Sequence, residues 1–146
     1  MCRVLGTLFM NDKREIVGVI EAMFAALRAH DAAGIASFLH PDATVWDYVT
    51  ARLLRGAGEH RKLLEASQAK MKTRGAFTMS LDTPVVDVWG DFAIACYTLV
   101  YDYQPPNPSS GTVRITSVLK RQGDSWLIVH HNEGVTPLGV APMEEP

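Results

Sequence analysis

The sequence predicts an α+β fold in which helices come first and an antiparallel sheet follows. Apolar residues recur at helical spacing over residues 12–29 and 58–73, in the first half of the chain. From residue 77 onward, apolar and polar residues alternate in runs that turn residues separate. Helices followed by strands along one chain are typical of α+β proteins. A length of 146 residues gives room for one domain, so we expect residues 1–146 to form a single unit.

The first helix is predicted over residues 12–29. Its apolar residues Ile16, Ile20, Met23, Phe24 and Leu27 fall on one face. Asp12 and Glu15 have the spacing of a capping box, in which each side chain accepts a hydrogen bond from a backbone donor near the other. With the helix beginning there, we expect residues 1–10 to be frayed, like the proline-containing residues 137–146.

A second, shorter helix should begin after Asp31, which is a good N-cap, and bury Ile35, Phe38 and Leu39. Pro41 is expected to end it, because the residue before a proline is disfavoured in helical conformation. Residues 43–50 are rich in β-branched and aromatic types, so they predict the first strand.

A third helix is predicted over residues 58–73, after the glycines that interrupt the chain before it. The other strands are expected over residues 77–82, 85–89, 92–103, 112–121 and 126–133. Residues 104–111 contain three prolines and predict a loop, while residues 90–91 and 122–125 predict turns.

The strand over residues 92–103 is apolar on both faces. Ile94 and Val100 lie on one face, and Ala95 and Leu99 lie on the other. A strand of this kind has to be covered on both sides. Because the helices can cover only one face, a second copy of the chain is the simplest cover for the other. We therefore expect a homodimer.

Charge and cysteine content bear on the partners and the compartment. The formal net charge is −2 and no stripe of Lys and Arg is present, so nucleic acid is not expected as a partner. No run approaches the roughly 18 apolar residues of a membrane span, and charged residues follow the short apolar stretch 1–10 where a signal peptide would be cleaved. Cys2 and Cys96 have no metal-site or disulfide spacing. We expect free thiols in a cytoplasmic protein that binds no membrane.

A series of short segments has the order and spacing of a known group of proteins. The segments are Phe24–Asp31, Ile35–Val45, Leu54–Gly56, Gly90–Ala93, Arg114–Thr116 and Gly123–His131. Through them the chain resembles the ketosteroid isomerases and SnoaL-like polyketide cyclases of the nuclear transport factor 2-like superfamily, over about residues 15–134. The resemblance implies a cone-shaped curved antiparallel sheet wrapped around the N-terminal helices, with one apolar pocket at the open end.

The resemblance places Asp47 where the isomerases keep their general base. A carboxylate in an apolar pocket loses solvation, and its pKa rises toward the range useful for proton transfer. The alternative is an aspartate that caps a turn or faces solvent. Met23 and Thr116 stand where the isomerases keep a tyrosine and a protonated aspartic acid as oxyanion donors. Steroid isomerisation by that mechanism is therefore not expected.

His130 and His131 are adjacent on a predicted strand, so they point to opposite faces, and the sequence leaves open which of them faces the pocket. A pocket histidine beside Asp47 could form an acid–base pair, since histidine titrates near neutral pH. The alternative is a histidine that is hydrogen-bonded in a dimer interface. Asn132 stands where the related association domains often have a further histidine.

The remaining candidates would bind a ligand. The resemblance favours an inward Arg114, beside Thr116, that would hold a carboxylate or enolate oxygen; an outward Arg114 would be an ordinary surface charge. Four aromatic residues could line the pocket or simply pack in the core or an interface: Trp46, Tyr48, Tyr97 and Tyr101. The adjacent histidines diverge, so we expect no metal, and no motif calls for a cofactor.

We therefore expect a small hydrophobic molecule in a cone pocket, with cofactor-free isomerase, dehydratase or cyclase chemistry carried by Asp47 and one histidine. The alternative is a noncatalytic dimeric module for ligand binding or association. The sequence identifies no ligand and does not decide whether the protein is an enzyme.

Overall fold

The computed structural model describes residues 2–135, and the predicted frayed end 137–146 lies outside this range. The elements follow in the order α1 (Cys2–Arg28), α2 (Ala32–Ser37), β1 (Leu39–Trp46), β2 (Leu54–Arg55), α3 (Ala57–Thr73), β3 (Phe77–Leu81), β4 (Val85–Trp89), β5 (Phe92–Tyr103), β6 (Ser109–Gln122) and β7 (Ser125–Val135). The α+β prediction is confirmed. Within the described range, no helix is both long and apolar enough to cross a membrane.

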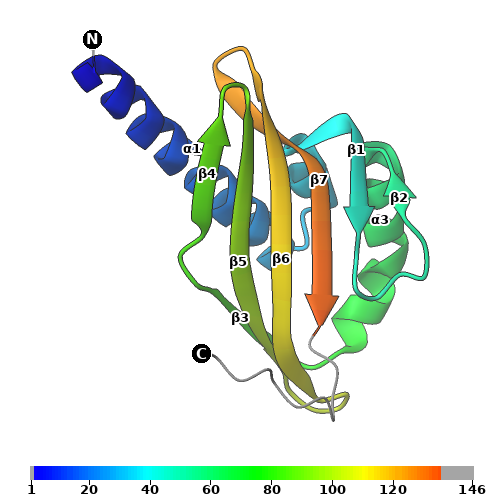
Figure 1. The fold of residues 1–146 in the computed structure, drawn as a ribbon. Coiled ribbons are helices and arrows are strands. Elements are labelled where there is room, and N and C mark those ends of the chain that lie inside the picture. The colour runs from blue at the N-terminus through cyan, green and yellow to red at the C-terminus, as the bar shows by residue number, and fades with distance from the viewer. Residues whose placement is uncertain (1, 136–146) are drawn as a thin grey trace.

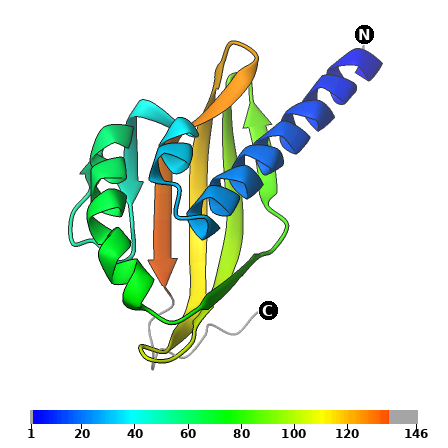
Figure 2. The same ribbon diagram turned by 180° about the vertical axis from the view of Figure 1, so that it is seen from behind.

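The strands form one curved, unclosed sheet in the order β2-β1-β7-β6-β5-β3, with β4 also paired to β5. Strand β1 runs parallel to β7, whereas the other pairs are antiparallel. The sheet is therefore mixed rather than wholly antiparallel. The helices lie across one face, as the view from behind shows (Figure 2), and no helix of residues 2–135 lies on the other face (Figure 1). We call these the inner and the outer face.

The core lies between α1 and the inner face of the sheet. Ile16, Ile20 and Phe24 fall on one side of α1 and are almost fully buried. On β6, Ile115 and Leu119 are buried and point inward, because alternate residues of a strand share a face. Burial of such side chains stabilises the fold by roughly 1.5–3 kcal/mol each.

Helix α1 begins at Cys2 rather than at residue 12, so the residues expected to be frayed are helical from Cys2 onward. The capping-box prediction is therefore wrong. Asp12 lies within the helix, is buried, and accepts a hydrogen bond from Nη2 of Arg121 on β6 at 2.7 Å. The ion pair with Arg121 therefore accounts for the aspartate at position 12, which the local sequence pattern predicts to be a helix cap.

The first strand begins at Leu39 and contains Pro41, which was expected to lie outside it. Asp31 caps α2 as predicted, with its Oδ1 accepting from the backbone N–H of Gly34 at 2.9 Å. Proline is tolerated here because the pairing of β1 with β7 is irregular between Leu39 and Thr44. The strand ends at Trp46, so Asp47 lies in the turn that follows.

Candidate functional site

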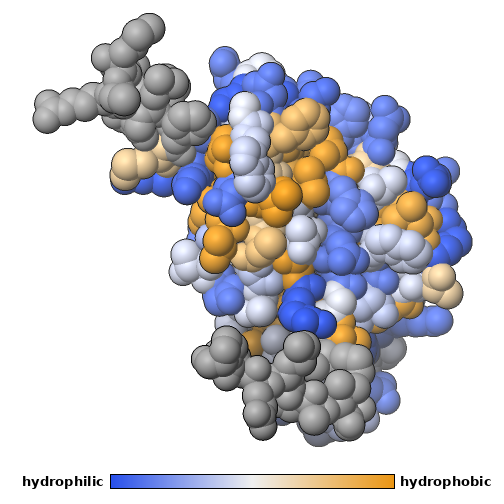
Figure 3. Space-filling view, in the orientation of Figure 1, coloured by the Kyte–Doolittle hydropathy of each residue, from blue (hydrophilic) through white to orange (hydrophobic). Residues whose placement is uncertain are grey.

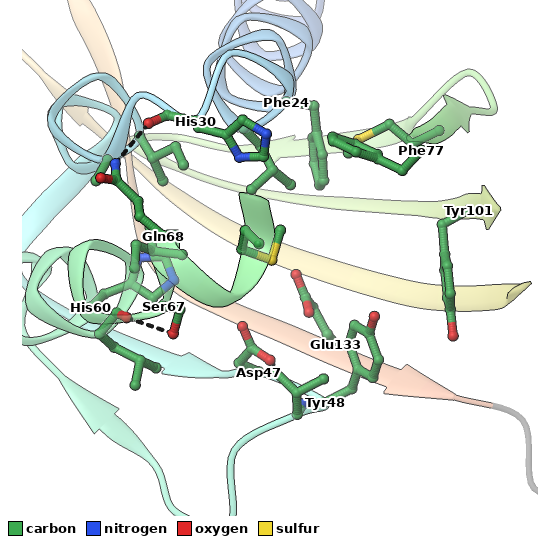
Figure 4. A pocket seen from close by; sticks show the side chains of 18 of the residues that line it. Phe24, His30, Asp47, Tyr48, His60, Ser67, Gln68, Phe77, Tyr101 and Glu133 are labelled. Carbon is green, nitrogen blue, oxygen red and sulfur yellow. Dashed lines mark hydrogen bonds between the residues drawn. The ribbon is translucent and has the colours of Figure 1, made fainter. Parts of the chain in front are cut away.

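A cavity of about 620 Å³ lies between the helices and the inner face of the sheet (Figure 4). Its wall is mostly apolar and includes Met23, Phe24, Leu63, Leu64, Met79 and Leu99. The volume falls in the range of roughly 300–1,000 Å³ that is typical of small-molecule sites.

Two carboxylates enter this cavity from different elements. Asp47 follows β1, and its Oδ1 accepts from the backbone N–H of Val49 at 2.8 Å, which fixes the turn. Glu133 projects inward from β7. Figure 4 shows both carboxylates pointing into the same part of the cavity, near Tyr48. Burial raises the pKa of Asp47, the charge of Glu133 raises it further, and the Val49 hydrogen bond opposes the rise only in part.

A chain of hydrogen bonds runs from the core to Glu133. The hydroxyl of Tyr97 lies 3.1 Å from Oγ of Ser117, and this Oγ lies 3.0 Å from Nδ1 of His131. Nε2 of His131 lies 3.0 Å from Oε1 of Glu133. A carboxylate only accepts, so Nε2 donates, and a neutral ring then accepts at Nδ1 from the serine hydroxyl. Each hydrogen-bonding group from Tyr97 to Glu133 therefore has a partner when the His131 ring is uncharged.

His60 adds an imidazole from α3. Burial lowers its pKa, which favours the neutral ring. Its Nδ1 is buried and has no hydrogen-bond partner among residues 2–135. A buried polar atom left unpaired costs free energy unless something occupies the site beside it.

Aromatic rings line one side of the cavity. The rings of Tyr48 and Tyr101 stack with centroids 6.1 Å apart, and Tyr103 meets Tyr101 edge-on at 6.0 Å. The guanidinium of Arg74 lies 4.1 Å from the centroid of the Tyr103 ring. Burial raises the pKa of Tyr48, so its hydroxyl keeps its proton and can donate a hydrogen bond.

The predicted site residues divide between the two faces of the sheet. Those that line the cavity are Met23, Asp47, Tyr48, Tyr101 and His131. Tyr97 also points inward and is buried, and its hydroxyl is linked to the cavity through Ser117 and His131. Asp47 and one histidine of the pair therefore line the same cavity, and each has its hydrogen bonds with other residues.

The other candidates lie on the outer face. His131 is buried and faces inward, while His130 faces outward, with its Nδ1 2.7 Å from Oγ1 of Thr44. The outward-facing site candidates are Trp46, Arg114, Thr116, His130 and Asn132. Arg114 is exposed between buried Val113 and Ile115, contrary to the expectation of an inward guanidinium. None of these side chains lines the cavity.

The site residues that were not among the candidates include Ser117, His60 and Glu133. Glu133 could have been found from the sequence, because a residue two places after His131 on a strand shares its face. No local signal marks His60 or Ser117, since their roles depend on strands and helices that meet only in the folded chain.

The outer face carries exposed apolar side chains on β4 and β5. We call Val85, Trp89, Phe92, Ile94 and Val100 the outer patch. Val85 and Trp89 are 66% and 62% exposed, and Val100 is 50% exposed. Figure 3 shows apolar surface gathered over these strands, with more polar surface toward β7 and β1. A large group of neighbouring exposed apolar side chains usually marks a surface that binds another molecule.

Solved structures of low sequence identity share this fold. An NTF2-like protein with a cystatin-like fold from Novosphingobium aromaticivorans has a TM-score of 0.79 at 18% identity, over 97% of this chain and 92% of that chain. A CaMKII hub homology domain from Chlamydomonas reinhardtii has a TM-score of 0.70 at 17% identity, over 85% and 98%. The CaMKII hub of S. rosetta has a TM-score of 0.70 at 18% identity, over 84% and 95%. A comparison with curated proteins finds no match.

The predicted resemblance to the NTF2-like superfamily is thus confirmed at the level of the fold. The sequence pattern of one family within it matches residues 12–137, which include the whole sheet and the part of α1 that packs on it. The chain belongs to the calcium/calmodulin dependent protein kinase II association domain family, within the NTF2-like superfamily.

Proposed function

We propose that this chain is an association module that binds a second copy of itself through the outer face of its sheet. The observation that carries the proposal is the outer patch, which leaves large apolar side chains of β4 and β5 in solvent. The family is named for association, and the structural neighbours described as hubs support the same reading. A second copy would cover the open face of β5 and give at least a homodimer.

The pairing of β4 with β5 brings four residues of the outer patch together. Trp89 lies opposite Phe92, and Val85 lies opposite Cys96, so side chains from β4 and β5 adjoin on the outer face. Large apolar and aromatic side chains that lose solvent contribute most of the free energy of a protein interface. More polar residues lie beside them on β6 and β7, including Arg114 and Asn132. An apolar centre bordered by polar residues is the usual arrangement of an interface.

Cys96 provides a direct test, because its thiol is exposed beside the outer patch. In a Cys2→Ser background, association should protect Cys96, so its rate of labelling by a maleimide should fall as the protein concentration rises. A Cys2→Ser/Cys96→Ser/Ala33→Cys variant serves as control, since Ala33 is exposed on α2, on the other side of the sheet. A Cys96 rate that does not depend on concentration, like that of the control, would contradict the proposal.

The cavity favours a second candidate function, the binding of a small hydrophobic molecule with proton transfer by Asp47 and His131. The support is an apolar cavity of about 620 Å³ that both residues line. Isomerase, dehydratase or cyclase chemistry would use Asp47 as the base, because its raised pKa brings it closer to neutral pH. Arg114 and Thr116 would take no part, since they lie on the outer face.

A thermal-shift screen with hydrophobic ketones tests this candidate. A hit should be lost in Leu64→Trp, which fills part of the cavity, and kept in Thr112→Val on the outer face. If Asp47 acts as the base, the protein should also convert the bound ketone to a product, and Asp47→Asn should abolish this conversion. A hit that survives Leu64→Trp would place its binding site outside the cavity.

A further inference from the structure

Asp47 and Glu133 share the cavity, and no lysine or arginine among the described residues forms an ion pair with either of them. Among residues 2–135, the Glu133 carboxylate has one hydrogen-bond partner, Nε2 of His131, and the hydrogen-bond chain is satisfied with that ring neutral. Asp47 accepts from a backbone N–H, which carries no net charge. Each carboxylate raises the free energy of the other in this largely apolar surrounding.

We propose that the cavity takes an organic cation, a primary or secondary amine on an apolar body, with its ammonium held by Asp47 and Glu133. This rests on the second candidate function, that the cavity binds a small hydrophobic molecule, and it names the chemical class of that molecule. An ammonium between the carboxylates relieves their repulsion and donates a hydrogen bond to each.

The charges around the cavity favour a cation over an anion. Within the described part of the chain, the lining contains one lysine, Lys70 in the last turn of α3, and one arginine, Arg74, directly after that helix. Arg74 already lies over the ring of Tyr103. An anionic ligand beside Asp47 and Glu133 would face two like charges, whereas an ammonium would face two opposite ones.

The other walls favour an organic cation over an inorganic one. Tyr48 and Tyr101 present stacked rings at the side where the carboxylates lie, and aromatic rings attract ammonium groups. Phe24, Leu63 and Met79 offer apolar surface to the rest of the ligand. Among residues 2–135, no group of three or more His, Cys, Asp or Glu side chains is arranged to hold a metal ion.

His60 offers a hydrogen-bond acceptor to which a ligand with several donors would bind. Its buried Nδ1 lacks a partner within the described residues, and the residue lines the same cavity. A neutral imidazole with a free ring nitrogen can accept a hydrogen bond. A primary ammonium has three donors, so it can serve an acceptor beyond the two carboxylates.

Isothermal titration with three probes of one skeleton tests the proposal. The probes are 4-phenylbutylamine, 4-phenylbutanol and 4-phenylbutanoate, which differ mainly in the charge of the head group. The full chain should bind the amine at least about tenfold more tightly than the alcohol, since charged hydrogen bonds contribute more than neutral ones, and the carboxylate should bind most weakly.

Charge-removing variants locate the effect. Asp47→Asn and Glu133→Gln should each weaken the amine about tenfold or more and leave the alcohol within about threefold of wild type. Asparagine at position 47 keeps an acceptor for the Val49 N–H, so this variant is informative even if Glu133→Gln fails to fold. Glu21→Gln is the matched control, because Glu21 is exposed on α1 and lies outside the cavity lining.

Each outcome decides a separate point. Equal affinity for alcohol and amine would overturn the cation proposal and leave the cavity as a site for neutral molecules. Binding of none of the three would overturn the cation proposal and count against the cavity as a ligand site. Amine affinity unchanged in both cavity variants would show that the carboxylates do not hold the ammonium. None of these results bears on association, which the labelling of Cys96 measures separately.

Discussion

His131 and Glu133 lie two residues apart on β7, on the same face of the sheet, with Nε2 and Oε1 3.0 Å apart. The other ring nitrogen of His131 is held by Ser117 at 3.0 Å, and Ser117 is held by Tyr97. His131 therefore fixes the position of the Glu133 carboxylate in the cavity. It does so from inside the core, where it is 5% exposed.

Replacing His131 should cost stability. His131→Ala leaves Ser117 without its imidazole partner and Glu133 without its hydrogen-bond donor, and leaving such groups unpaired costs about 1–3 kcal/mol each. Urea unfolding followed by circular dichroism measures the loss. His130→Ala is the matched control and should cost less than about 1.5 kcal/mol, because its hydrogen bond to Thr44 lies on the half-exposed outer face. Equal losses in the two variants would contradict the inward role of His131.

Asp47→Asn should increase the free energy of unfolding at neutral pH. Burial and the charge of Glu133 raise the pKa of Asp47 above its ordinary value of 3.8, and the hydrogen bond from the Val49 N–H opposes this rise only in part. The folded state then holds the proton of Asp47 at a higher pH than the unfolded chain does. The free energy of unfolding therefore falls as the pH rises through the raised pKa, and the ionised carboxylate is destabilising above it.

Asparagine removes that charge and keeps an acceptor for the Val49 N–H. The stability gain of Asp47→Asn should be largest at neutral pH and should shrink as the pH falls through the raised pKa toward 3.8. Melting temperatures between pH 4 and 7.5 measure the difference, with Asp42→Asn, at an exposed residue of β1, as control. A variant less stable than wild type at neutral pH would refute the account of Asp47.

The ion pair between Asp12 and Arg121 should contribute more to stability than a surface pair. Asp12 is buried within α1, and the Arg121 guanidinium also lies 4.5 Å from the centroid of the Trp126 ring. Asp12→Ala should cost about 1–3 kcal/mol in urea unfolding, because a charged, partly buried hydrogen bond is lost. Glu65→Ala breaks the exposed pair of Arg61 and Glu65 and should cost less than about 0.5 kcal/mol. If the two variants lose a similar free energy of unfolding, the pair of Asp12 and Arg121 contributes no more than an exposed pair, which would contradict this prediction.

The sequence predicts the elements whose residues interact locally. The strand over residues 92–103 is observed with the bounds its alternation predicts, and α3 begins within one residue of its expected start. The pairing of β1 with β7 could not be read from the pattern, because the two strands are distant in sequence. Asp12 was misread for the same kind of reason, since its partner Arg121 is 109 residues away.

The pair of histidines shows why the site could be predicted only in part. Strict alternation from buried Trp126 and Ile128 would place His130 inside. The register shift between Val118 and Leu119 adds a residue on β7, so His131 faces inward instead. The irregularity depends on how β6 and β7 pair, and no residue type in the sequence marks it.

Association through the outer patch is the central claim, and sedimentation equilibrium at micromolar concentration tests it most directly. The wild-type chain should show at least twice the monomer mass of 16.1 kDa. Ile94→Glu places a charge in the outer patch and should return the mass to that of the monomer, whereas Met10→Glu, at an exposed apolar residue of α1 outside both the outer patch and the cavity lining, should not. A wild-type mass of 16.1 kDa, or an assembly that survives Ile94→Glu unchanged, would contradict the account.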